Sequence, residues 1–145
     1  MKSALLMWQF WAAAAALFAA LTAVFAKLGV ENVNSDFATF IRTIVVLFAL
    51  AVLLLTTGQW QGFGAVSGRT YVFLVLSGLA TGASWLCYFR ALQLGDVARV
   101  APIDKLSVVL VALFGAVFLG ERLAAVNWLG VAMIAGGALL VAYRV

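Results

Sequence analysis

The sequence predicts an all-α membrane protein, a bundle of five transmembrane helices. Of its 145 residues, 67% are hydrophobic and only 10% are charged, whereas soluble domains are about 45–50% apolar and about 25% charged. Five charge-poor runs stand out, each near the roughly 20 residues that cross a ~30 Å hydrocarbon core. Because the backbone must satisfy its own hydrogen bonds in lipid, helices are the favoured structure for such runs.

The five predicted helices follow one another with little between them. They lie at about 4–26, 37–58, 70–89, 100–119 and 123–143, and the intervening stretches are short and turn-like. Connections this short predict neighbouring helices that run antiparallel. No linker or low-complexity stretch interrupts the chain, so we expect one transmembrane domain over residues 1–145.

The first run has an alternative interpretation as a signal peptide, because it follows a charged "MK" and ends in "VFA" before Lys27. Its apolar stretch exceeds the roughly 7–15 residues of a signal h-region, and its charged start holds one lysine. We therefore expect this helix to remain in the protein.

Charges and tryptophans give weak signals of orientation. The loop cations lean slightly toward a cytoplasmic C-terminus, and such a small bias also fits a chain that inserts in both orientations. Dual insertion would let two copies form an antiparallel pair like the inverted repeats of transporters. Four tryptophans fit an interfacial belt on the side of the N-terminus, and a fifth, Trp85, is predicted to line a pathway instead. The four are Trp8, Trp11, Trp60 and Trp128.

Polar residues inside the runs concentrate in the half nearest the C-terminus. In the third run they share one helical face by their spacing, and a hydroxyl turned toward lipid would be desolvated, so this face is predicted to line a cavity. We expect polar groups from three runs to converge on one pocket. They are Thr39, Arg42 and Thr43 from the second run, Thr81, Ser84, Trp85 and Tyr88 from the third, and Asp104, Lys105 and Ser107 from the fourth.

Two adjacent charges begin the fourth run. Pro102 suits a first helical turn, which predicts a helix start near residue 101 and places Asp104 where its carboxylate meets the positive end of the helix dipole. Lys105 would oppose that dipole, so it either snorkels to headgroups or has an anionic partner. The possible anions are Asp104, Asp96, Asp36 or a transported solute.

Arg42 lies roughly 8 Å into the second predicted helix at 1.5 Å per residue. It is predicted to snorkel, to pair with Asp104, or to bind solute, because an ionisable residue within a span is a functional candidate. Small residues four apart, such as Gly78 and Gly82, predict close helix contacts, and their number favours dimerisation.

Several function classes are excluded. The chain has no histidine and a single cysteine, Cys87, which argues against an enzyme with a His-based or Cys-based catalytic site, a metal site or a cofactor. Its net charge of +4 sits on short loops, where it bears on lipid headgroups rather than on nucleic acid.

The last part of the chain resembles an EamA-type repeat of the drug/metabolite transporter superfamily. The resemblance rests on "YFRALQLGDVARVAPIDKLSVVLVALFGAVFLGERL" followed by "NWLGVAMIAGGALLVAY", on the "LGE" turn at 119–121, and on Arg42 near the start of the second run. Members usually hold ten helices in two units of opposite orientation, so the resemblance implies half a transporter completed by a second copy. The charged "PIDKLS" departs from the uncharged start common at this point.

These observations predict a secondary transporter that moves a small polar or amphipathic metabolite or drug-like solute by alternating access. The predicted partners are that solute, membrane lipid, and a second chain, either in a homodimer that is antiparallel or in a heterodimer with a related half. We expect a multi-pass protein of a bacterial-type inner membrane. The alternative is an accessory subunit that docks on another membrane protein without transporting anything.

Overall fold

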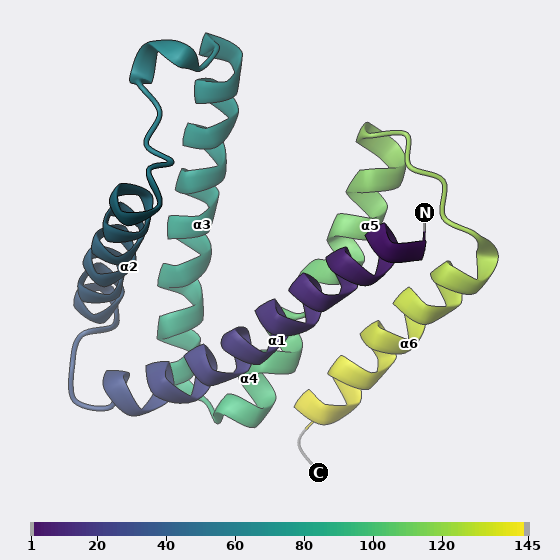
Figure 1. Ribbon diagram of the computed structural model, residues 1–145. Helices are drawn as coiled ribbons and strands as arrows, with labels where there is room; N and C mark the ends of the chain where they lie inside the picture. Colours follow the sequence, from purple (N-terminus) through teal and green to yellow (C-terminus); the bar gives the residue numbers. More distant parts are fainter. Residues whose placement is uncertain (1, 144–145) are drawn as a thin grey trace. The chain divides into compact units, whose positions relative to one another are not determined.

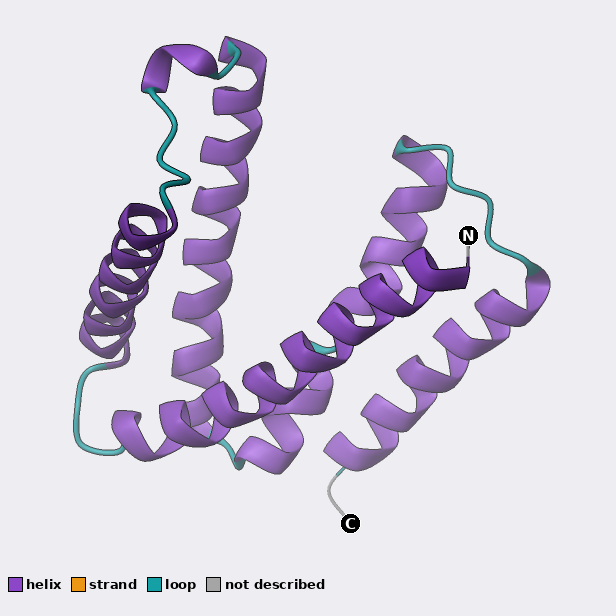
Figure 2. Ribbon diagram, viewed as in Figure 1, coloured by secondary structure: helices purple, strands orange, loops and turns teal. Residues whose placement is uncertain are grey.

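The computed structural model describes residues 2–143, with the side chains of that range except those of residues 2–7 and 63. The described part of the chain is 84% helical. No strand occurs between residues 2 and 143, where helices are joined by short loops (Figure 2). Five segments are long and apolar enough to cross a membrane, which confirms the predicted fold class. In chain order the helices are α1 (Lys2–Val30), α2 (Ser35–Thr57), the 3₁₀ turn η1 (Phe63–Ala65), α3 (Gly68–Leu94), α4 (Val97–Asp104), α5 (Ser107–Phe118) and α6 (Ala125–Ala142) (Figure 1).

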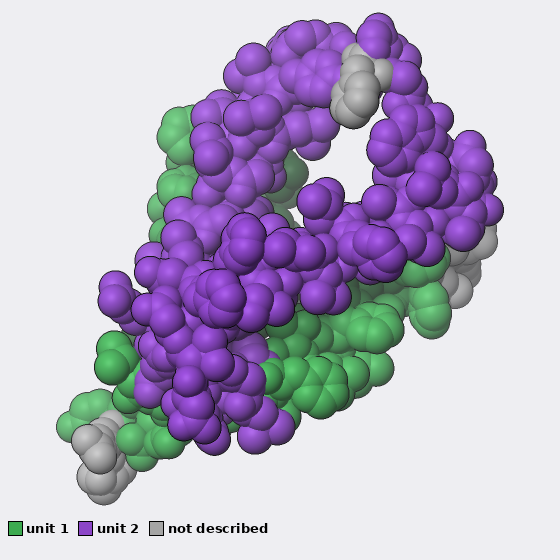
Figure 3. Space-filling model, turned by 90° about the vertical axis from the view of Figure 1, so that its left-hand side faces the viewer, with its two compact units in different colours: residues 1–25, 94–145 green, residues 26–93 purple. Residues whose placement is uncertain are grey.

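The chain forms two compact units. Residues 26–93 form one unit, and residues 1–25 together with 94–145 form the other (Figure 3). We call them the central unit and the terminal unit. The single domain expected from the sequence stays a prediction.

In the central unit, the sequence sets both ends of α2. The side-chain oxygen of Asn34 accepts hydrogen bonds from the backbone N–H groups of Asp36 (2.9 Å) and Phe37 (3.2 Å). Asp36 also places a carboxylate in the first turn, where it complements the helix dipole. At the other end, Gly58 has a φ of 66°, a conformation that glycine adopts without steric cost and that commonly ends a helix.

The C-terminal end of α3 is hydrogen-bonded to the turn between α1 and α2. The Lys27 ammonium donates to the carbonyl of Leu92 (2.7 Å), and the Gln93 amide donates to the carbonyls of Val30 (3.1 Å) and Val33 (2.6 Å). The buried side chains of this unit lie at the end of α1, at the start of α2 and at the end of α3. They are Ala26, Val30, Ser35, Thr39, Phe89 and Leu92. Hydrogen bonds and burial therefore hold one end of α2 and one end of α3 beside the end of α1.

Both α1 and α3 extend beyond the helices predicted from the sequence. Residues 90–94 were expected to connect the third and fourth helices, but they belong to α3, which ends at Leu94. The physical reason is local, because "RALQL" holds good helix formers and neither glycine nor proline. The loop before α4 is correspondingly shorter than expected.

In the terminal unit, α6 packs against α4 and α5. Gly115 and Ala138 are buried, and small residues of this kind allow helices to approach closely. The carbonyl of Gly115 accepts the N–H groups of Leu119 (3.2 Å) and Glu121 (3.0 Å), and Gly120 between them has a φ of 69°. The Glu121 carboxylate covers Gly115 so closely that a Cβ there would lie 2.7 Å from Glu121 Oε2.

The fourth membrane-spanning segment, Val97–Phe118, is broken into two helices, which corrects one sequence prediction. The helix begins at Val97 rather than near residue 101, so the prediction that Asp104 lies in its first turn was wrong: Asp104 is the last residue of α4. Pro102 lies inside α4, where its missing N–H and its ring weaken the helical ladder. Three bonds across the break have the tighter i to i−3 spacing, namely Leu106 to Ile103, Val108 to Lys105 and Val109 to Leu106 (each 3.0 Å).

Candidate functional site

The central unit brings three of the predicted site residues together, namely Arg42, Trp85 and Tyr88. The Cζ atom of Arg42 lies 4.0 Å from the centre of the Trp85 ring and 5.5 Å from the centre of the Phe89 ring. Tyr88 interacts electrostatically with the same guanidinium. We call Arg42, Trp85, Tyr88 and Phe89 the arginine–aromatic cluster.

Helical spacing explains why α3 presents these three aromatics together. Trp85, Tyr88 and Phe89 are three and four residues apart, so they share one face of α3. Arg42 stands seven residues after Ser35, the first residue of α2, which places it about 10 Å along that helix at 1.5 Å per residue. Phe89 is only 3% exposed, and it is the buried member of the cluster.

The surroundings of Arg42 combine aromatic rings with no carboxylate of its own unit. A guanidinium over aromatic rings gains about 0.5–2 kcal/mol. An arginine at the centre of a membrane span costs at least ~2.5–3.5 kcal/mol, and the cost is smaller for one that lies nearer the end of a helix, as Arg42 does. In the described part of the central unit, neither Glu31 nor Asp36 forms an ion pair with Arg42. The cluster therefore presents a positive charge that no carboxylate of this described unit neutralises.

Three threonines that were expected to line a cavity are bonded to their own helices instead. Thr39 donates to the carbonyl of Ser35 (2.8 Å), Thr43 to that of Thr39 (2.8 Å), and Thr81 to that of Ser77 (2.9 Å). A hydroxyl satisfied in this way is not desolvated without a partner when it faces lipid. The polarity of these three residues therefore does not by itself require a cavity beside them.

The other predicted residues of α3 and α5 lie as follows. Ser84 is exposed, although it shares the face of Thr81, Trp85 and Tyr88. Ser107 is exposed at the first position of α5. The prediction that all of these groups converge on one pocket is not tested by the fold and stays a prediction.

Asp104 and Lys105 pair with each other at the break between α4 and α5. The Lys105 Nζ atom lies 3.1 Å from Asp104 Oδ2, with the lysine side chain 56% exposed and the aspartate side chain 34% exposed. Of the anions proposed for Lys105 from the sequence, Asp104 is thus the partner observed. Lys105 is the C-terminal cap of α4, so its charge complements the helix dipole there rather than opposing it.

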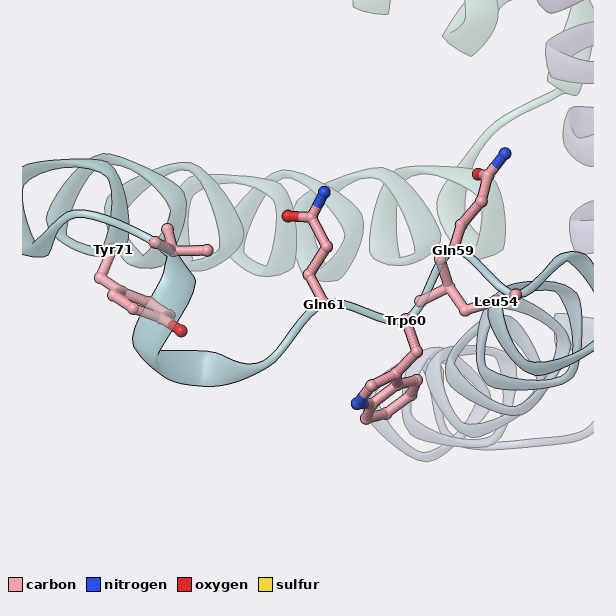
Figure 4. Close-up of a pocket in the computed structure, with 7 residues that line it drawn as sticks. Leu54, Gln59, Trp60, Gln61 and Tyr71 are labelled. Carbon is pink, nitrogen blue, oxygen red and sulfur yellow. The ribbon is translucent and has the colours of Figure 1, made fainter.

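A shallow hollow lies elsewhere in the central unit, in the connection between α2 and α3 (Figure 4). Gln59, Trp60 and Gln61 project from this connection, and Tyr71 comes from the start of α3. Gly58 in its wall ends α2, at the opposite end of that helix from Arg42. Tryptophan and tyrosine are enriched at membrane interfaces, and the interfacial position of Trp60 stays a prediction.

Sequence reasoning missed Phe89 and the pair of donors Lys27 and Gln93. Phe89 follows Trp85 by four residues, a spacing that places both rings on one face and could have revealed it. Lys27 and Gln93 bond to backbone carbonyls 60 to 65 residues away, and no local pattern signals such contacts. Within the described residues, no group of three histidine, cysteine, aspartate or glutamate side chains is placed to hold a metal ion.

Comparison with known proteins decides the family. Residues 6–143 match the EamA-like transporter family. This chain belongs to that family. The resemblance inferred from the "LGE" turn and Arg42 is thereby confirmed, and the EamA-family chain is a multi-pass integral membrane protein and a membrane transporter.

Two relatives of this EamA protein carry transporter names. It is 67% identical over 135 residues to the "Uncharacterized transporter in cobO 3'region" of Sinorhizobium sp, an alignment that covers 93% of this chain and 96% of the relative. It is 34% identical over 80 residues to the "Riboflavin transporter" of Rhizobium johnstonii, covering 55% of this chain but only 26% of that protein. No solved structure gives a significant match.

Proposed function

We propose that this EamA protein is a secondary transporter of a small polar or amphipathic solute, working by alternating access as a dimer of five-helix halves. The observation that carries the proposal is the break in the fourth span at Lys105 and Leu106, next to a pair of opposite charges. Irregular backbone at membrane depth is tolerated where it lines a cavity or is buried in protein. Interrupted helices of this kind form the solute and ion sites of secondary transporters.

The candidate solute-binding residues follow from these features. From α4 and α5 they are Asp104, Lys105 and Ser107, and from the central unit they are Arg42, Trp85 and Tyr88. Thr81 and Ser84 remain candidates through their shared helical face. The Rhizobium relative makes riboflavin the first neutral solute to test.

A dimer is supported by two observations. The Sinorhizobium relative is matched over 96% of its length, so a protein of similar size exists in this family. Glycines on α3 and α6 have no described atom within 4 Å of the place where a Cβ would stand, and these are Gly78, Gly82, Gly130, Gly136 and Gly137. Such open small-residue faces allow close contact with a second helix. The second chain is a copy, in antiparallel orientation, or a related half.

Transport by reconstituted protein tests the proposal. Purified protein in liposomes is assayed for uptake of a panel of neutral, cationic and anionic solutes that includes riboflavin. Lys105→Ala and Asp104→Asn are expected to reduce uptake of the accepted solute by about 100-fold, because each removes a charged contact worth about 1.5–3 kcal/mol. Arg122→Ala and Asp96→Asn, which change exposed charges of the same terminal unit, are expected to leave uptake within about twofold of wild type.

Normal uptake in both charge variants would dismiss these residues from the site. Failure of every solute to cross, together with copurification of a different membrane protein, would favour the accessory subunit instead. Topology reporters fused to both ends test the dimer. Both orientations in comparable amounts support an antiparallel homodimer, and a single orientation excludes it.

A further inference from the structure

The arginine–aromatic cluster has the chemistry of an anion site. The Cζ atom of Arg42 lies over the Trp85 ring, 4.0 Å from its centre, and arginine commonly lies on aromatic rings while its N–H groups bind an anion. A guanidinium is a rigid fork of N–H donors that matches a carboxylate or a phosphate through two parallel hydrogen bonds. The cluster thus holds a donor fork beside an aromatic ring.

No carboxylate of the described central unit occupies that fork. The acidic residues of residues 26–93 are Glu31 and Asp36. Both are exposed, and Asp36 accepts the hydroxyl of the adjacent Ser35 (3.2 Å). Arg42 lies about two turns into a membrane-spanning helix. An anion that neutralises its charge therefore comes from outside this unit.

The surroundings of the fork are apolar. The Phe89 ring lies 5.5 Å from the Arg42 Cζ atom and is buried, and Trp85 is half-buried. A small inorganic anion would lose its hydration here without gaining apolar contacts, whereas an anion with an apolar body would bury that body against the rings. The chemistry favours an amphipathic organic anion.

We propose that the arginine–aromatic cluster binds the carboxylate or phosphate of an amphipathic organic anion, and that such anions are the solute class of this transporter. The inference rests on the proposed transport function. The same chemistry is found in the phosphate of a lipid headgroup, so the experiment must separate a soluble anion from a lipid.

Binding is measured as thermal stabilisation of the purified protein in phosphatidylcholine nanodiscs. The probes are 2-naphthoate, its neutral counterpart 2-naphthamide, phenyl phosphate and inorganic phosphate. We expect 2-naphthoate and phenyl phosphate to stabilise wild type in a saturable manner, and 2-naphthamide and inorganic phosphate to have little effect. A parallel series replaces part of the phosphatidylcholine with phosphatidylglycerol and adds no soluble probe.

Variants assign the effect to Arg42. Arg42→Gln is expected to weaken 2-naphthoate binding about 100-fold, and Arg42→Lys, which keeps the charge but loses the planar fork, about 10-fold. The matched control is Arg69→Gln, which removes another arginine of this unit that lies over an aromatic ring, at 5.8 Å from the centre of Phe73. It is expected to bind 2-naphthoate within about twofold of wild type.

Three outcomes overturn the proposal. The first is stabilisation by neither 2-naphthoate nor phenyl phosphate, and the second is stabilisation that Arg42→Gln and Arg42→Lys both retain. The third is Arg42-dependent stabilisation by phosphatidylglycerol alone, which identifies a headgroup site. Because Arg42→Lys keeps the charge and the length of the side chain, it tests the proposal even where Arg42→Gln folds poorly.

Uptake into liposomes separates this inference from the proposed function. Neutral or cationic solutes that cross the membrane equally in wild type and Arg42→Gln would overturn the inference and leave the transport function standing. Arg42-dependent binding of 2-naphthoate without uptake of any solute would overturn the transport function and show an anion site in a protein that does not transport. Arg42-dependent uptake of 2-naphthoate supports both.

Discussion

Two regions of this EamA protein place a cation in a membrane-spanning segment, and they do so in different ways. Arg42 lies within the continuous helix α2 and stacks on the rings of Trp85 and Phe89 from another helix. Lys105 lies where the fourth span is broken and pairs with its own neighbour, Asp104. The first arrangement depends on packing between helices, whereas the second arises within a few residues of chain.

The difference matters for how each cation reaches a solute. Lys105 is 56% exposed and its partner is one residue away, so the pair has little to hold it in one geometry. Arg42 is half-buried and its Cζ atom lies over the Trp85 ring at 4.0 Å from the centre, while the neighbouring Phe89 is only 3% exposed. We infer that the arginine–aromatic cluster is the preorganised region and that the broken span is the adaptable one.

The largest expected effect comes from removing Pro102, the proline that precedes the break. Pro102→Ala restores a backbone N–H inside α4, and a proline in a helix interior costs about 3 kcal/mol, so we expect a gain of about 1–3 kcal/mol in the free energy of unfolding. We also expect uptake of the accepted solute to fall about 10-fold, because a more regular helix is less adaptable. Thermal unfolding, helical circular dichroism and liposome uptake measure these changes.

Binding of 2-naphthoate to the arginine–aromatic cluster is the internal control for Pro102→Ala. It should stay within about twofold of wild type, since the cluster lies in the central unit. A more stable variant with undiminished uptake would show that the interruption has no part in transport.

An intermediate effect is expected from the hydrogen bonds that hold the end of α3. Lys27→Met removes the donor to the Leu92 carbonyl, and Gln93→Leu removes the donors to Val30 and Val33. We expect each to lower the free energy of unfolding by about 1 kcal/mol and to weaken 2-naphthoate binding several-fold, because Trp85 and Phe89 lie within the last turns of α3. Chemical or thermal unfolding and the nanodisc binding assay provide the readout.

Arg90→Met is the matched control for Lys27→Met. It removes an exposed cation from the end of α3 that carries Leu92, the acceptor of Lys27. It should change neither the unfolding free energy by more than about 0.5 kcal/mol nor binding. Equal losses in Arg90→Met and Lys27→Met would mean that charge near this end of α3, rather than the bond to Leu92, supports the cluster.

The smallest effect compares the two cations directly. A double-mutant cycle on Arg42→Gln and Trp85→Leu is expected to give a coupling free energy of about 0.5–1 kcal/mol for the cation–π contact. The same cycle on Lys105→Ala and Asp104→Asn is expected to give less than about 0.5 kcal/mol, as for other exposed ion pairs. Unfolding measurements on the four single and two double variants supply both values, and a stronger coupling in the Asp104–Lys105 cycle would reverse the contrast between the regions.

Much of the fold could be predicted from the sequence. The five spans follow from long charge-poor runs. The break in the fourth span was missed, because Pro102 was interpreted as a first-turn residue when the helix in fact begins at Val97. Proline occurs in the first turn of a helix and, at a cost in stability, in a helix interior. Only the hydrogen bonds of the neighbouring residues distinguish these two positions.

The candidate site was predicted only in part. Arg42, Trp85 and Tyr88 were proposed from their polarity and spacing, and the structure brings them together. Thr39, Thr43 and Thr81 were proposed on the same grounds, yet their hydroxyls bond to their own helices. A sequence gives the polarity of a side chain, but the partner of a hydroxyl depends on its rotamer and on the carbonyl four residues before it.

The sequence by itself determined that this chain is a five-span helical protein of the EamA family, because hydropathy, helix propensity and turn residues act over short stretches of chain. The tertiary structure alone decided that the Arg42 guanidinium lies on Trp85 and Phe89, and that Lys27 and Gln93 hold the end of α3. Contacts of this kind depend on how each helix is rotated about its axis and which face it turns toward its neighbour. That rotation is set by packing between segments far apart in the sequence.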